Sequence, residues 1–242
     1  MGLQPVGLVQ GFYCGQISNW SGYSTDVLRR YNCPHAYRDQ NHPPPGWVGA
    51  MSSLDNEWMS AHGTALARML KEAADLGAHG IVGVTTEMSH PTNESSCEIH
   101  LYGTAVVVEG AQPPQTVWST QLAGHKLAKL VEIGFVPKQV AYTRSTSVLV
   151  EGCNMEYFGS GQCGTGQVIQ PLQDAHELAR RGAMDAATRM AGQASMYDVR
   201  LQIHESERYR STYITCSLLG SMVRRVRTTE SIAAPISTVN LA

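Results

Sequence analysis

The stretch ARMLKEAADLGAHGIVGV, residues 67–84, decides the fold, because it joins an amphipathic helix to a buried strand. Apolar residues at helical spacing mark one face of the helix: Leu66, Met69, Leu70, Ala73 and Leu76. Oppositely charged residues four positions apart occupy the other face, and Gly77 supplies a helix stop. We therefore expect a helix that runs from a cap at Asp55 to about Leu76 and lies on a sheet.

The run IHLYGTAVVVE, residues 99–109, predicts a strand that is buried on both faces. One alternating set contains Ile99, Leu101, Ala105 and Val107, and the other contains Tyr102, Val106 and Val108. A strand with one face in water carries polar residues at every second position, and this one does not. We expect its own helix to cover one face and another domain or subunit to cover the other.

The sequence contains an internal repeat. LYGTAV (101–106) aligns with LLGSMV (218–223) at an offset of 117 residues, and GLQPVGLV (2–9) resembles GFVPKQVA (134–141) at an offset of 132. The first offset pairs Val82 with Val199. A second helix is expected near Pro171, with an apolar side formed by Ala175, Leu178, Ala179, Ala186 and Met190. The predicted fold class is α+β, with two tandem β-α-β-β units, each a helix packed on a short antiparallel sheet.

Four segments follow from this alignment. We expect a first unit at 1–112, a linker at 113–121, a second unit with a leading helix at 122–227, and a C-terminal tail at 228–242. The tail is polar, which is typical of disorder, yet IAAPISTVNLA (232–242) has enough apolar residues to dock as an added strand on a neighbour. The tail is thus also a candidate site for a protein partner.

The block 67–84 and the run EIHLYGTAVVV (98–108) resemble the core of the YbjQ-like family, in its tandem two-copy form. The second copy also has a leading helix like that of the family, in LAGHKLAKLVEIGF (122–135), whereas the first copy begins at Met1. The resemblance implies a β-α-β-β unit that self-associates into rings, commonly fivefold. It carries a heavy-metal-binding label and no catalytic residues.

Composition favours association and excludes some partners. Of the 242 residues, 43% are apolar and 16% are charged, which leaves surface available for contacts. The net charge of −2 argues against nonspecific nucleic-acid binding. Residues 1–121 carry five basic and ten acidic side chains, and residues 122–242 carry thirteen and ten, so the halves have charges of −5 and +3. No run approaches the length of a membrane span, and a signal peptide pattern is absent, so we expect a cytoplasmic protein without membrane insertion.

Two groups of Cys and His are candidate ligands for a divalent or soft metal ion. Cys33 and His35 lie in a loop rich in proline, and Cys97 and His100 lie beside the last strand of the first unit. Residues three apart on a regular strand face opposite ways, so Cys97 and His100 share a metal only if Cys97 precedes the strand. Neither group recurs in the second copy, and buried thiols with solvated histidines explain them equally well.

The glycine run GSGQCGTG (159–166) has the spacing of a phosphate-binding loop, but its context is wrong. Residues NMEYF separate it from the preceding strand, and QVIQ delays the helix, so it is better interpreted as a variable loop. The sequence also lacks a nucleophile elbow and an HExxH motif. Our first hypothesis is a noncatalytic, ring-forming protein; the alternatives are a metal-binding or metal-buffering protein and an enzyme with a site between subunits.

Overall fold

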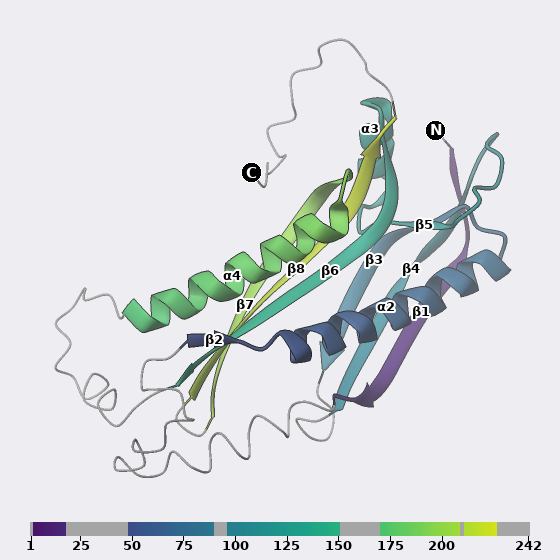
Figure 1. The fold of residues 1–242 in the computed structure, drawn as a ribbon. Helices are drawn as coiled ribbons and strands as arrows, with labels where there is room; N and C mark the ends of the chain where they lie inside the picture. The colour runs from purple at the N-terminus through teal and green to yellow at the C-terminus, as the bar shows by residue number, and fades with distance from the viewer. Residues whose placement is uncertain (1, 18–47, 90–95, 151–169, 209–210, 227–242) are drawn as a thin grey trace, which may run out of the picture.

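The computed structural model describes residues 2–17, 48–89, 96–150, 170–208 and 211–226. Within these ranges the chain is a mixed α+β protein with three helices and two four-stranded sheets (Figure 1). Figure 1 shows α2 lying along the first sheet and α4 along the second. The α+β class predicted from the sequence is confirmed.

Sheet 1 has the strand order β1-β4-β3-β5. Its elements are β1 (Leu3–Gln16), α2 (Ser52–Asp75), β3 (Gly80–Ser89), β4 (Ser96–Val108) and β5 (Trp118–Ser119). The first three strands are antiparallel, with β4 between β1 and β3, whereas β5 runs parallel to β3. The chain thus forms a strand, a helix and a hairpin in which the last strand is central.

Sheet 2 has the order β2-β6-β8-β7 and repeats this pattern. Its elements are β2 (Val48–Ala50), β6 (Phe135–Val150), α4 (Gln170–Ala191), β7 (Ser195–Arg208) and β8 (Ser211–Arg225), and α3 (Gly124–Glu132) leads into β6. Here β8 is central, between β6 and β7. Strand β2 comes from the first half of the chain, immediately before α2, so the two halves are joined at this sheet edge.

The two sheets also share their irregularities. In β1 the register shifts between Pro5 and Gly7, and in β6 it shifts between Pro137 and Gln139, which is the predicted offset of 132. In the hairpins, β3 bulges opposite Gly103 and β7 bulges opposite Gly220, at the predicted offset of 117. A β-bulge bends and twists its strand at a defined point, so a shared bulge position is a specific likeness.

The bulges correct one predicted pairing. Each bulge contains a residue with positive φ, Gly83 at 64° in β3 and Asp198 at 53° in β7. Glycine and aspartate are residues that adopt this conformation with little strain. The two strands therefore correspond at an offset of 115 rather than 117, and the counterpart of Val82 is Tyr197 instead of Val199.

The helices match the prediction in position but differ in detail. Helix α2 begins at Ser52, so Asp55 is inside its first turn and buried, and the predicted cap at Asp55 is wrong. The stop at Gly77 is confirmed by its φ of 70°. In α4 an alanine at every fourth position is buried: Ala175, Ala179, Ala183 and Ala187. The predicted contribution of Met190 to this face is wrong, because its side chain is 41% exposed.

Helix α2 lies between the two sheets and joins their cores. One cluster of buried side chains combines residues of sheet 1, such as Ile99, with α2 residues such as Met69 and with Val140 and Tyr213 of sheet 2. A second cluster lies under α4, and a third surrounds α3. Among the residues described, no helix has both the length and the apolar character that a membrane span requires.

Candidate functional site

Each sheet has one face that lies away from its own helix. In sheet 2 this face contacts α2 and is the more completely covered of the two. On β6, Val140, Tyr142 and Thr146 are at most 5% exposed. Tyr213 and Leu219 on β8 pack in the same cluster as α2. Residues of β6 between them, such as Thr143 and Ser147, face α4 on the other side. We call this surface the covered face of sheet 2.

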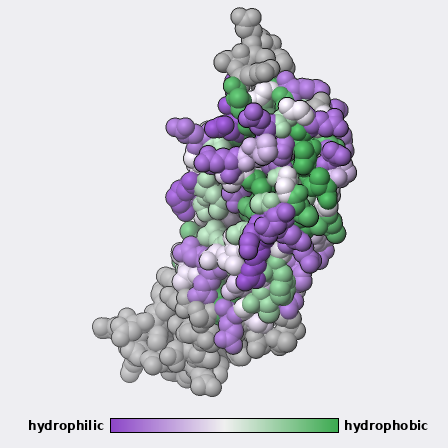
Figure 2. Space-filling model, turned by 90° about the vertical axis from the view of Figure 1, so that its right-hand side faces the viewer, coloured by the Kyte–Doolittle hydropathy of each residue, from purple (hydrophilic) through white to green (hydrophobic). Residues whose placement is uncertain are grey.

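The corresponding surface of sheet 1 is open. Val9, Ile99 and Leu101 face α2, so the alternating residues of β1 and β4 point away from it. This outer face of sheet 1 consists of Leu8, Gln10, Phe12 and Cys14 on β1 and of Glu98, His100, Tyr102 and Thr104 on β4. On the side of the molecule that carries β1, Figure 2 shows hydrophobic residues gathered towards the right-hand edge.

Exposure distinguishes the two faces at matching positions. The offset of 132 places Leu8 opposite Val140 in the alignment and Phe12 opposite Arg144. Leu8 is 74% exposed whereas Val140 is 2% exposed, and Phe12 is 41% exposed. An exposed cluster of large apolar side chains is typical of an interaction surface. The matching face is therefore covered by α2 in sheet 2 and left exposed by the described residues in sheet 1.

A buried ion pair holds α2 against the covered face. Arg144 Nε lies 3.3 Å from Asp55 Oδ1, and the two side chains are 12% and 5% exposed. Asp55 also accepts hydrogen bonds from the backbone N–H of Thr146, at 2.7 Å, and from its hydroxyl, at 2.7 Å. The backbone N–H of Met51 donates to the carbonyl of Thr146 at 2.8 Å. A buried carboxylate with three such donors fixes the position of a helix precisely.

Aromatic residues of α2 complete this contact. The Arg144 guanidinium lies 4.6 Å from the centroid of the Trp58 ring, in a cation–π arrangement. The ring of His62 stacks on Tyr142 with centroids 4.9 Å apart and planes at 26°. Asp55, Trp58 and His62 lie on one face of α2, because successive members are about one helical turn apart. These three residues and their β6 partners are the polar joint between the two halves.

Burial shifts the pKa values of three groups in the polar joint. It lowers the pKa of His62 to about 4 and raises the pKa of the Tyr142 hydroxyl. The pKa of Asp55 is also raised by burial, against the opposing effect of Thr146 and Arg144. His62 Nε2 has no hydrogen-bond partner among the described residues. At neutral pH the histidine is thus a neutral, stacked group, which suits packing rather than proton transfer.

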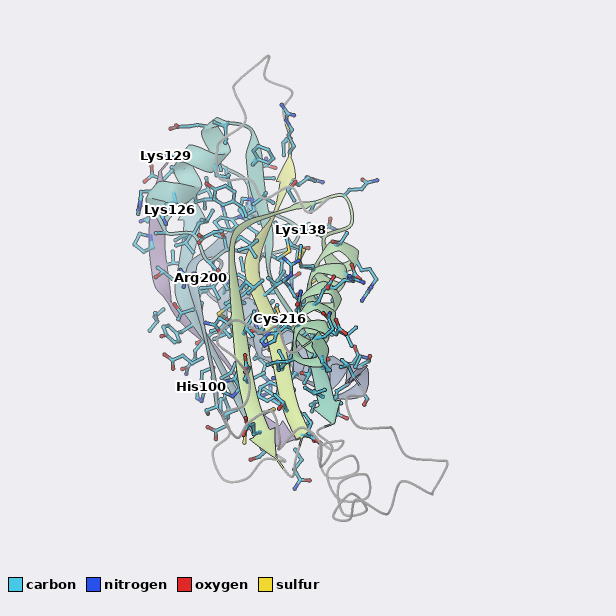
Figure 3. All side chains as sticks on the ribbon, turned by 90° about the vertical axis from the view of Figure 1, so that its left-hand side faces the viewer. His100, Lys126, Lys129, Lys138, Arg200 and Cys216 are labelled. Carbon is cyan, nitrogen blue, oxygen red and sulfur yellow. The ribbon has the colours of Figure 1, made fainter. Side chains whose placement is uncertain are left out.

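The predicted metal ligands do not come together in the part of the chain that is described. Cys33 and His35 lie outside the described residues. Cys97 is in β4, fully buried against α2, and burial raises the pKa of its thiol. His100 is on the opposite face, exposed and 4.5 Å from the Phe12 ring, on the side of the molecule away from α4 (Figure 3). The described residues contain no group of three or more His, Cys, Asp or Glu side chains placed to hold a metal ion.

Sequence reasoning missed the polar joint. Asp55 was assigned to a helix cap, and the alternation of Tyr142, Arg144 and Thr146 in AYTRSTS (141–147) was not interpreted. The signal was present, since a strand with an arginine among inward-facing residues needs a buried acidic partner. Which acid it would be depends on the packing of two units, which the local pattern does not define.

Part of the chain matches a known protein family. Residues 46–109 match the family model YbjQ_1, described as "Putative heavy-metal-binding". The matched region covers β2, α2, β3 and β4, so this part of the chain is similar to that family. The resemblance identified from the sequence is confirmed for this region. No curated protein matches the chain.

Proposed function

We propose that this protein is a noncatalytic subunit of a closed ring, in which the outer face of sheet 1 is covered by the second half of the next copy. The observation that carries the proposal is the exposure of Leu8 and Phe12 at positions whose counterparts in sheet 2, Val140 and Arg144, are only 2% and 12% exposed. The contact inside the chain is the template for the contact between chains.

This contact is heterologous, because it joins a helix side of one unit to a sheet face of the next. Heterologous contacts propagate from copy to copy and close into a ring when the rotation between units permits it. Within one chain, α2 of the first unit covers sheet 2 of the second. When the same kind of contact forms between chains, the second unit of one copy covers sheet 1 of another copy. A tandem duplication is the simplest source of such a chain, and the YbjQ-like resemblance favours a fivefold ring.

Charge supports the same order of contacts. The first half of the chain has a net charge of −5 and the second half +3, from the counts of acidic and basic residues. A contact between the second half of one copy and the first half of the next brings opposite charges together, which favours that pairing over like halves. Leu8 and Phe12 on the outer face then become buried in the contact, and each stabilises it by about 1.5–3 kcal/mol when fully covered.

A structural role is favoured over the two alternatives. Asp55, Arg144 and Tyr142 of the polar joint contact one another's elements across the two halves, through the ion pair and the ring stack, which supports a packing role. Metal binding rests on the family description and on loop residues outside the described part of the chain. The Cys97 and His100 pair gives it no support, because the two side chains lie on opposite faces of β4.

Light scattering on the full chain at micromolar concentration tests the proposal. The expected result is a mass several times that of one chain. Replacing Leu8 with glutamate buries a charge in the proposed contact, so we expect the dissociation constant to rise at least tenfold, with the stability of the isolated subunit changed by less than about 0.5 kcal/mol. The matched control is Leu76→Glu, since Leu76 is 47% exposed outside the outer face.

A monomeric mass for the unmodified chain would overturn the proposal. An oligomer that dissociates equally with Leu8→Glu and Leu76→Glu would show that the outer face of sheet 1 is not its interface.

A further inference from the structure

Two short segments of the chain resemble each other and occupy matching places after the hairpins. Residues 118–123 read WSTQLA and residues 236–242 read ISTVNLA, so each has an apolar residue followed by Ser-Thr and then Leu-Ala. Trp118 lies ten positions beyond Val108, the end of β4, and Ile236 lies eleven positions beyond Arg225, the end of β8. The second segment is one residue longer before Leu-Ala.

The first segment is an added strand on the edge of sheet 1. It runs parallel to β3, and the N–H of Thr120 donates to the carbonyl of Ile81 at 2.9 Å. In return, the N–H of Val84 donates to the carbonyl of Thr120 at 3.0 Å, and the N–H of Gly83 donates to that of Leu122. The segment therefore closes the edge of β3 around its bulge.

The hydroxyl groups of the same segment join the covered face of sheet 2. The N–H of Val140 donates to Ser119 Oγ at 3.0 Å. Thr120 Oγ1 and Ser221 Oγ form a hydrogen bond of 2.9 Å, and Ser221 Oγ also accepts from the N–H of Gln121. Ser119, Thr120 and Ser221 are all fully buried. A Ser-Thr pair on one sheet edge is thus the hydrogen-bonded link to the face of the next sheet.

The link uses two surfaces, the β3 edge of sheet 1 and the covered face of sheet 2. Each has a counterpart that the described residues leave open, namely the edge of β7 and the outer face of sheet 1. The shared bulge aligns Ile81 with Met196 and Val84 with Val199, on β7. Strand β7 is the terminal strand of sheet 2 in the described part of the chain, and Val199 is half-buried where Val84 is buried. On the outer face of sheet 1, Leu8 stands opposite Thr104, as Val140 stands opposite Ser221.

The counterpart of the Ser221 hydroxyl is therefore another hydroxyl, that of Thr104. Thr104 is partly exposed.

We propose that residues 236–241 add a strand to the edge of β7 and that the hydroxyls of Ser237 and Thr238 bind the outer face of sheet 1 in a second copy, at Leu8 and Thr104. This inference rests on the proposed ring, for which it names the hydrogen-bonded seam. The occupant of the β7 edge is the chain's own tail, and the acceptor surface belongs to the neighbouring copy.

Thr238→Pro in the full chain is the first test, because proline removes the N–H that corresponds to the Thr120 donor and also removes the hydroxyl. Its control is Thr229→Pro, in the same tail but before the repeated segment. Two quantities are measured on each protein: the dissociation constant of the oligomer, by light scattering across a dilution series, and the hydrogen exchange rate of the amides of residues 196–199.

For Thr238→Pro we expect the dissociation constant to rise about tenfold or more and amide exchange at 198 and 199 to become at least tenfold faster. Thr229→Pro leaves both unchanged. Thr104→Val, which keeps the shape and removes the hydroxyl, raises the dissociation constant about threefold to tenfold without changing exchange in β7.

The outcomes separate the two proposals. A monomeric unmodified chain overturns the ring itself, and the seam with it. An oligomer whose mass and β7 exchange are unaffected by Thr238→Pro overturns the seam alone. Faster β7 exchange in Thr238→Pro with an unchanged dissociation constant shows that the tail covers its own sheet and overturns the contact with the second copy.

Discussion

The two sheets are built to the same plan but are completed differently. Sheet 2 has its outward face covered by α2 and one edge extended by β2, both from the first half of the chain. Sheet 1 has its β3 edge closed by β5 but its outer face open, with Leu8 at 74% exposure. The difference teaches that a sheet with its own helix still presents a second face. In sheet 2 that face is covered by α2, whereas in sheet 1 the described residues leave it exposed.

The covered face depends most on its buried ion pair, so the largest effect is expected from Asp55→Asn. The substitution keeps the shape of the side chain but leaves the Arg144 guanidinium buried without its charge partner. Breaking a buried pair in this way costs about 3–5 kcal/mol. Urea unfolding monitored by tryptophan fluorescence measures the change. Asp75→Asn, at an exposed position of the same helix, serves as the control and should shift stability by less than about 0.5 kcal/mol. Equal effects would show that the pair does not hold α2 in place.

The two helices approach their sheets closely by different means, and a pair of glycine substitutions compares them. At Gly11 on β1, an added Cβ would lie 2.0 Å from the backbone oxygen of Ala65 in α2. At Gly182 in α4, it would lie 2.3 Å from the hydroxyl oxygen of Ser145. A backbone carbonyl cannot move without displacing the helix, whereas a serine hydroxyl can rotate away.

We therefore expect Gly11→Ala to destabilise the protein by about 3 kcal/mol. Gly182→Ala should change stability by less than about 1 kcal/mol, because the gain in helix propensity offsets the local crowding. Thermal unfolding of both variants measures the difference. If Gly182→Ala proved the more harmful of the two, α4 would be the helix that is held more tightly against its sheet.

The parts of the fold that sequence patterns predicted are those determined by one element and its neighbours. The helix stop at Gly77 follows from local chemistry, and the offset of 132 aligns Pro5 with Pro137, where both strands shift register in the structure. The alignment of β3 with β7 failed by two residues, because a bulge changes the count without changing the apolar pattern. Asp198 in β7 has the positive φ that Gly83 has in β3. Because the two residues differ, the sequence alignment does not show that these positions correspond.

The candidate site was less predictable because it is made between units. Asp55 looks like a cap when only its own helix is considered, and it becomes a buried ion pair only after β6 packs on α2. Cys97 and His100 could share a metal ion only if Cys97 preceded the strand, but β4 begins at Ser96, so its alternation separates them. The residues that matter at such a contact are set by tertiary packing, which is absent from a single-element pattern.

An effect smaller than those of Asp55→Asn and Gly11→Ala concerns the pH dependence of the covered face. The pKa of His62 falls from 6.5 to about 4 because the ring is buried against Tyr142. Between these two values the unfolded chain binds more protons than the folded one, so stability decreases as the pH is lowered. From pH 7 to pH 5 the loss is about 2 kcal/mol. His62→Gln removes this contribution, whereas the raised pKa of Asp55 acts in the opposite direction and is present in both proteins. On the outer face of sheet 1 the residue that aligns with Tyr142 is Gln10, so that face offers no ring on which a histidine like His62 could stack. The free energy of unfolding, measured in urea at each pH, should therefore have a shallower slope in His62→Gln than in the unmodified protein, and identical slopes would place the acid sensitivity elsewhere.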